Sequence, residues 1–180
     1  GRMAGDSVER DLSWLDGTLT PKLSDDGTKM LFQEWGEGGG GRSSAYFWKL
    51  DGSTPVRLGE GTPWNATPDW KWAVCLVGPP YRLRLVPIGA GDVKELPLGS
   101  LSEATWGIIC PDGKRMLVIG AEAGRPQRFF MQDLPDGVPR PFTPEGISIY
   151  SYPTSPDGRL WTARPPGPRA PYLLYSIDGG

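Results

Sequence analysis

The chain has 180 residues, 38% of them hydrophobic and 22% charged, a formal net charge of −2 and a pI near 5.2. This length predicts one domain with enough apolar residues for a core. Without a basic excess or a run of Lys or Arg the sequence has no electrostatic footprint for nucleic acid, and without an apolar run approaching ~18 residues no membrane insertion is expected.

Short apolar segments alternate with turns rich in glycine and proline, which indicates strands and not helices. The first unit has predicted strands over residues 18–23, 29–33, 44–50 and 55–58. Asp51-Gly52 is a hairpin turn between the last two strands. The unit is therefore predicted to be a four-stranded antiparallel meander.

Three further units follow the same plan. The second has predicted strands over residues 63–66, 71–76, 81–86 and 93–96, and the third over 105–109, 115–119, 128–133 and 139–142. The fourth has them over 150–152, 159–163 and 172–176 and lacks its last strand. No segment shows helical spacing of apolar residues over ten or more positions, so the fold class is predicted to be all-β.

One turn motif recurs where the first strand of each unit ends. Its aspartates are 43, 43 and 45 residues apart along the chain. In such a turn a glycine takes a positive φ and the aspartate bonds to its own backbone. The residues assigned to this structural role are Asp26, Gly27, Asp69, Asp112, Gly113, Asp157 and Gly158.

Four-stranded units that repeat every 40 to 45 residues are typical of the blades of a β-propeller. The prediction is a single domain over residues 1–180 with four four-stranded blades. The approximate blade ranges are 18–60, 61–98, 103–144 and 148–180, the last completed by 6–13.

The strand missing from the last blade suggests how the ring closes. The segment Val8 to Leu12 is predicted to pair with Tyr172 to Ser176, which would leave only short edges. Two alternatives are that the chain is part of a larger propeller, or that two copies complete an eight-bladed ring as a homodimer across a two-fold axis.

The turn motif resembles the WD40-like (PD40) repeat of TolB-type proteins. Ser155-Pro156-Asp157-Gly158-Arg159 matches the family pattern, and Cys110-Pro111-Asp112-Gly113-Lys114 departs at one position. Ser24-Asp25-Asp26-Gly27 lacks the proline, and Thr67-Pro68-Asp69-Trp70 lacks the glycine. The resemblance covers the chain from about Leu19 to Gly180 and implies a non-catalytic propeller that binds proteins or senses a ligand.

A second resemblance concerns three glycine-containing segments. The run from Arg10 to Gly17, with Glu37 to Gly41 and Val56 to Gly61, is similar to extracytoplasmic propeller regions of bacterial serine/threonine kinases and winged-helix regulators. This similarity implies a bacterial sensor domain in an extracytoplasmic or periplasmic location.

The residue types present limit which catalytic and metal sites the chain can form. The absence of histidine removes Ser-His-Asp and Cys-His nucleophile pairs and imidazole zinc sites. The glycine-rich loop over 37–41 lacks the ending of a phosphate loop, and Asp25-Asp26 and Glu34 lack a calcium-loop pattern, so no cofactor or metal is expected. Cys75 and Cys110 lie at non-equivalent points of their repeats, which favours two buried free thiols over a disulfide.

Aromatic residues near the starts of the first strands are the candidate ligand contacts. Trp64, Trp106 and Tyr152, with Lys22 and Asn65 beside them, are predicted to lie near a central channel. Such aromatic side chains stack on a sugar or peptide or anchor a partner. The alternative is that they fill the wedge between blades.

The function predicted from these observations is a non-catalytic binding, sensor or scaffold module that presents a channel mouth and loops to a protein, peptide or small ligand. One alternative is an enzyme of the glycosidase or lyase kind with a carboxylate pair across the channel. Another is an assembly module that pairs through edge strands.

Overall fold

The computed structural model describes residues 9, 11–15, 17–36, 42–147, 155, 157–167 and 169–177. The first sheet contains β1 (Thr18–Leu23), β2 (Lys29–Glu34), β3 (Ser44–Lys49) and β4 (Val56–Glu60). The second contains β5 (Thr62–Ala66), β6 (Trp72–Val77), β7 (Arg82–Pro87) and β8 (Lys94–Leu96). The third contains β9 (Leu101–Ile109), β10 (Arg115–Glu122), β11 (Arg128–Asp133) and β12 (Arg140–Pro141).

Each of these three sheets is an antiparallel meander in which neighbours in sequence are neighbours in space. The prediction of an all-β chain with four-stranded antiparallel units is confirmed for the first three repeats. The described part of the fourth repeat is a two-stranded sheet of β13 (Leu160–Ala163) and β14 (Leu173–Ser176). Its predicted first strand, over residues 150–152, lies outside the described residues.

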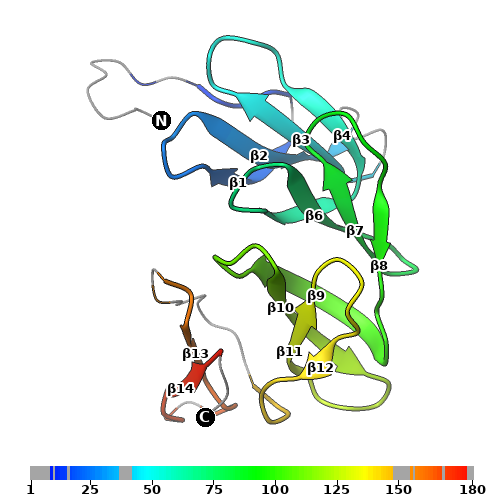
Figure 1. Ribbon diagram of the computed structural model, residues 1–180, viewed down its shortest axis with the longest axis vertical. Helices are drawn as coiled ribbons and strands as arrows, with labels where there is room; N and C mark the ends of the chain where they lie inside the picture. Colours follow the sequence, from blue (N-terminus) through cyan, green and yellow to red (C-terminus); the bar gives the residue numbers. More distant parts are fainter. Residues whose placement is uncertain are drawn as a thin grey trace.

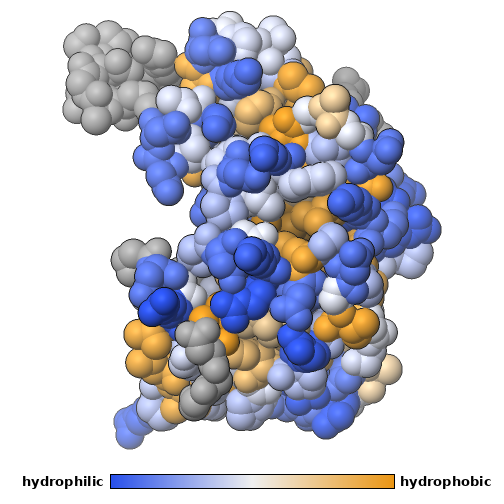
Figure 2. All heavy atoms as spheres, viewed as in Figure 1, coloured by the Kyte–Doolittle hydropathy of each residue, from blue (hydrophilic) through white to orange (hydrophobic). Residues whose placement is uncertain are grey.

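The four sheets follow one another around an arc, with the first sheet and the β13–β14 sheet at its two ends (Figure 1). The space-filling view is hollowed on the side where the arc is open (Figure 2). The described part of the chain contains no helix long and apolar enough to cross a membrane.

The hydrophobic core lies between successive sheets, and β10 shows how one strand serves two interfaces. Its side chains alternate in direction, as in any strand. Met116 and Val118 contact the cluster shared with the second sheet, whereas Leu117 and Ile119 contact the cluster shared with the fourth. All four are essentially fully buried. This explains why the strand is apolar from Met116 to Ala121, because both of its faces are covered there.

The predicted ring closure is not confirmed. Val8 and Arg10, which belong to the predicted closing strand, lie outside the described residues. Leu12, which is described, packs against the first sheet beside Met30 and Phe32. Among the described strands β14 pairs with β13 alone. No closed ring of sheets is therefore found in the part of the chain that the structure describes.

A buried carboxylate fixes the segment that leads into β1. Glu34 has no exposed surface, and its carboxylate oxygens accept hydrogen bonds from the backbone N–H groups of Leu15 and Gly17, each at 3.3 Å. The Thr18 hydroxyl also donates to Glu34. A buried charge is tolerated where several donors surround it, so this contact ties the incoming segment to the first sheet.

Replacement of Glu34 by alanine is expected to lower the free energy of unfolding by about 2 kcal/mol, because two backbone N–H groups and one hydroxyl lose their acceptor. Urea denaturation followed by tryptophan fluorescence measures the change. Glu60→Ala is the matched control, since Glu60 forms an exposed pair with Arg42, and such pairs contribute little. Equal losses in the two variants would contradict the assigned role.

Candidate functional site

Three of the repeated turns lie where β1, β5 and β9 end, and the first, second and fourth turns share one hydrogen-bond pattern. In the first, the Ser24 hydroxyl donates to the Asp26 carboxylate at 2.5 Å, and the Thr28 N–H donates to the same oxygen at 3.0 Å. The Lys29 N–H in turn donates to the Ser24 hydroxyl at 2.9 Å. The hydrogen bond from Ser24, followed by those from Thr28, lowers the pKa of Asp26 to about 2. The carboxylate is therefore committed to the turn.

The second and fourth turns repeat this pattern. The Thr67 hydroxyl donates to Asp69 at 2.6 Å and the Ser155 hydroxyl to Asp157 at 2.5 Å. These hydroxyl bonds, followed by backbone N–H bonds, lower the pKa of both aspartates. An acidic residue held in this way by its own turn has a structural role.

The third turn differs because Cys110 stands where the others have a hydroxyl. Asp112 instead accepts hydrogen bonds from the Lys114 N–H at 2.8 Å and from the Arg115 Nε at 2.8 Å. Cys110 and Cys75 are both buried free thiols, which confirms the interpretation of the cysteines. Burial raises the pKa of each thiol to about 12, so neither is a thiolate at neutral pH.

We expect Cys110→Ser to change the free energy of unfolding by less than about 0.5 kcal/mol. The new hydroxyl is expected to donate to Asp112, as the serine hydroxyls of the first and fourth turns donate to the equivalent aspartates. Cys75→Ser is the matched control. Cys75 lies in β6 within the core shared by the first two sheets, so a hydroxyl there is expected to cost about 1–3 kcal/mol. Urea denaturation of both variants compares the two positions, and equal losses would contradict the prediction.

A pocket of about 490 Å³ opens among the same turns. It lies where the first strands of three sheets end, with one wall completed by the fourth repeat. Its lining residues are Lys22, Leu23, Ser24, Asp25, Asn65, Ala66, Thr67, Pro68, Trp70, Ile108, Ile109, Pro111, Ser155 and Trp161. The volume is in the range of sites that hold small molecules or a few peptide residues.

Three polar groups on this lining are not used by contacts among the residues that the structure describes. The Lys22 ammonium and the Asp25 carboxylate have no hydrogen-bond or ion-pair partner among the described residues. Asn65 is buried, and its side-chain oxygen accepts a hydrogen bond from the Ala66 N–H at 2.8 Å, which leaves its amide NH₂ as a donor. The pocket therefore offers two donor groups and one acceptor group beside apolar surface.

The structure brings together two of the five predicted contact residues, Lys22 and Asn65. Trp64 is 9% exposed and belongs to the core between the second and third sheets, and Trp106 is half-buried between that core and the next. Neither tryptophan lines the pocket. Tyr152 lies outside the described residues.

Sequence reasoning missed Asp25, Trp70 and Trp161 as lining residues. For the first two a signal was present, because they stand where the repeat otherwise has proline and glycine. Trp161 carried no such signal. Among the described residues no group of three or more acidic or cysteine side chains is arranged to hold a metal ion.

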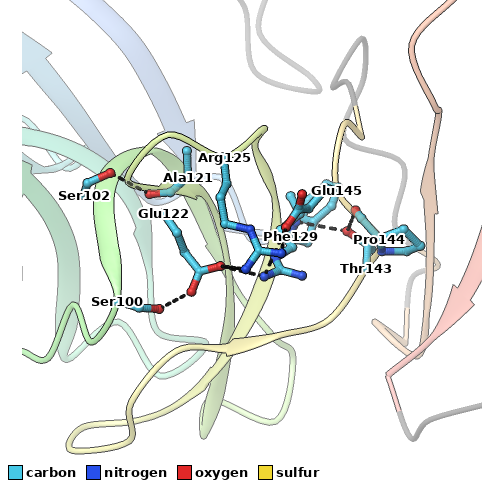
Figure 3. Close-up of polar contacts among 10 residues, drawn as sticks. Ser100, Ser102, Ala121, Glu122, Arg125, Phe129, Thr143, Pro144 and Glu145 are labelled. Atoms are coloured by element: carbon cyan, nitrogen blue, oxygen red, sulfur yellow. Dashed lines mark hydrogen bonds and ion pairs between the residues drawn. The ribbon is translucent and has the colours of Figure 1, made fainter.

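A charged cluster at the other end of β10 contrasts with the pocket (Figure 3). Glu122 accepts hydrogen bonds from Ser100 at 2.6 Å and from Arg128 at 2.6 Å, and these two contacts in that order lower its pKa. Arg125 pairs with Glu145 at 2.5 Å. The two arginines and two glutamates balance one another, so the cluster presents no free charge and is assigned to stability.

These observations define the class of the fold as all-β, with four-stranded antiparallel sheets that follow one another in an arc as the blades of a β-propeller do. No protein-family model matches the sequence, and no curated protein matches it. Solved structures, in contrast, are similar to the chain. TolB from Acinetobacter baumannii aligns with a TM-score of 0.71 and 23% identity, and a putative TolB from Agrobacterium tumefaciens with a TM-score of 0.71 and 17% identity. The β-propeller domain of the Trilobed protease from Pyrococcus furiosus aligns with a TM-score of 0.64 and 10% identity.

The alignments span most of this chain and part of each neighbour. They cover 93%, 88% and 91% of this chain, and 42%, 61% and 55% of the respective neighbours. The chain therefore spans less than two thirds of each of them. At these identities the likeness establishes the fold, and it supports the resemblance to TolB-type propellers that the turn motifs indicate.

Proposed function

We propose that the chain is a non-catalytic binding module that holds a peptide segment of a partner protein in the pocket at the ends of β1, β5 and β9. The observation that carries the proposal is the set of three polar groups with no use in the fold, on Lys22, Asp25 and Asn65. A peptide main chain supplies carbonyl acceptors for the two donors, and apolar side chains suit the rest of the lining.

The pocket gives the enzyme alternative no support. A glycosidase needs two carboxyl groups on opposite sides of the substrate. Among the described residues, Asp25 is the one acidic side chain on the lining. The other aspartates of the repeats that the structure describes are held by their turns.

Peptide selection tests the proposal. Random peptides displayed on phage are selected on the wild-type chain, and the enriched peptides are titrated against two pocket variants. Asn65→Leu removes the amide donor, and Lys22→Trp places a bulky indole in the pocket. Both variants are expected to lose binding at least tenfold. Val138→Ser, at a surface position 54% exposed and outside the pocket, is the control and is expected to bind normally. Selected peptides that bind the pocket variants normally would overturn the proposal.

A second candidate is assembly through the edge of the fourth sheet. Strand β14 pairs only with β13 among the described strands. Leu174 within β14 is 63% exposed, and Tyr172, just before the strand, is 58% exposed. Unpaired edges add strands from other chains. Sedimentation velocity over a concentration series tests this candidate. Self-association that Leu174→Lys abolishes would support it, and a monomer at every concentration would remove it.

A further inference from the structure

The four repeated turns are not equivalent, and the exception occurs at one junction that borders the pocket. In the first, third and fourth turns Gly27, Gly113 and Gly158 have φ of 68°, 66° and 66°. In the second turn the residue is Trp70, with φ of 55°. All four N–H groups donate to the carbonyl oxygen three residues earlier at 2.8–2.9 Å, so the turn itself is unchanged. Trp70 therefore occupies a left-handed conformation that costs a non-glycine residue free energy.

The junctions between successive turns differ in the space that they leave for a side chain at the glycine position. A Cβ atom on Gly113 would lie 3.4 Å from the Cδ of Pro68 in the preceding turn, and one on Gly158 would lie 2.1 Å from the Cδ of Pro111. In the first turn, the position equivalent to Pro68 and Pro111 holds Asp25. The junction between the first turn and Trp70 therefore lacks the proline. Both departures from the repeat fall on one junction, and both residues line the pocket.

The exchange replaces two neutral residues by a carboxylate and an indole. This pair has the chemistry of a cation site, because a carboxylate pairs with a cation and an aromatic face attracts one. A cation already lies there, since the Lys29 ammonium is 5.9 Å from the centre of the Trp70 ring. Phe47 contacts the same ring at a centroid distance of 6.2 Å and supports it from the first sheet.

We propose that Asp25 and Trp70 form a subsite for a basic side chain, an arginine above all, of a peptide bound in this pocket. The inference rests on the proposed function. A planar guanidinium stacks on an indole and is more weakly hydrated than an ammonium, which favours arginine over lysine. The carbonyl groups beside that residue supply acceptors for the Lys22 ammonium and the Asn65 amide. One segment thereby satisfies the polar groups of Lys22, Asp25 and Asn65 on the pocket lining.

Two cations of the chain itself oppose such a ligand. Lys29 lies over the indole face, and Lys22 is on the pocket lining. The ligand's guanidinium must displace Lys29 from the ring. This competition predicts that removal of the Lys29 charge strengthens binding, a sign that a purely structural role for Trp70 does not predict.

The test compares two capped heptapeptides of glycine and serine that differ only in a central arginine or citrulline, its uncharged counterpart. Titration followed by two-dimensional nitrogen–proton spectra reports on the Trp70 indole and the Asn65 amide. The arginine peptide is expected to bind about tenfold more tightly than the citrulline peptide. Asp25→Asn is expected to remove that difference, and Lys29→Met to tighten arginine binding about threefold. Trp70→Gly, which restores the residue of the repeat, is expected to weaken it.

Each outcome decides the inference. Equal binding of the two peptides at the pocket would overturn the basic subsite and leave the proposed function standing. Tighter binding of a peptide with a central glutamate, or weaker binding by Lys29→Met, would overturn it as well. No binding of either peptide overturns the subsite, and the phage selection then decides the proposed function separately. Thermal unfolding of each variant shows whether a loss of affinity reflects a loss of fold.

Discussion

Replacement of Gly158 by alanine is expected to destabilise the chain by about 3 kcal/mol or more, because two costs add at this position. A φ of 66° is unfavourable for alanine by roughly 1–2 kcal/mol. The new Cβ would also lie 2.1 Å from the Cδ of Pro111, which is bonded to the backbone and cannot swing aside. Forced overlap of this kind costs a further 1–3 kcal/mol, roughly. Urea denaturation followed by fluorescence measures the sum.

Gly113→Ala is the matched control, since Gly113 has the same φ of 66° but 3.4 Å of clearance from Pro68. It is expected to show the backbone cost alone. The double variant Gly158→Ala with Pro111→Gly isolates the contact, because it removes the ring that the new methyl group meets. If both single variants lose the same free energy, contact between the turns of successive repeats does not limit this position.

The arrangement of strands was predictable because its determinants are local. The turn around Asp112 closes on residues within three positions, and β10 and β11 read as apolar segments of the right length. The Asp112 turn marks the boundary between the first and second strands of its repeat. Local turn chemistry and strand pattern agree in each of the first three sheets, which is why the sequence specifies them clearly.

The sequence left Trp64 either as a ligand contact or as a filler between blades; the structure agrees with the second, and a β-bulge explains why alternation could not decide. In the pairing of β5 with β6, Pro63 lies opposite Cys75 and Asn65 opposite Val74, so Trp64 is the extra residue between two successive pairs. A bulge inserts one residue and re-aims the side chains around it. Sequence alternation cannot show where this occurs. The structure places the Trp64 ring in the core and the neighbouring Asn65 on the pocket lining.

The closing strand stays a prediction, because sequence pattern alone does not decide what its segment packs against. A segment distant in sequence pairs or packs according to which apolar surface covers its side chains. Leu12 packs on the first sheet beside Tyr46. Trp14 contacts Trp48 there at a centroid distance of 6.2 Å. A short segment with two apolar anchors fits an edge strand and a covering segment equally well by pattern alone.

Trp64→Ala is expected to lower the free energy of unfolding by about 3–5 kcal/mol, because it leaves an indole-sized cavity between two sheets. Gly107 of β9 faces the ring so closely that a Cβ there would lie 2.7 Å from Trp64 Cε3. A glycine has no side chain to fill the space that alanine would open, so the cavity is expected to persist. Trp35→Ala is the control, since Trp35 is 54% exposed and its truncation is expected to cost less than about 0.5 kcal/mol.

Binding of pocket-selected peptides, measured where the variant is still folded, separates the two roles of Trp64. Normal stability with lost binding would restore Trp64 as a ligand contact, whereas lost stability with retained affinity assigns it to the joint between the second and third sheets.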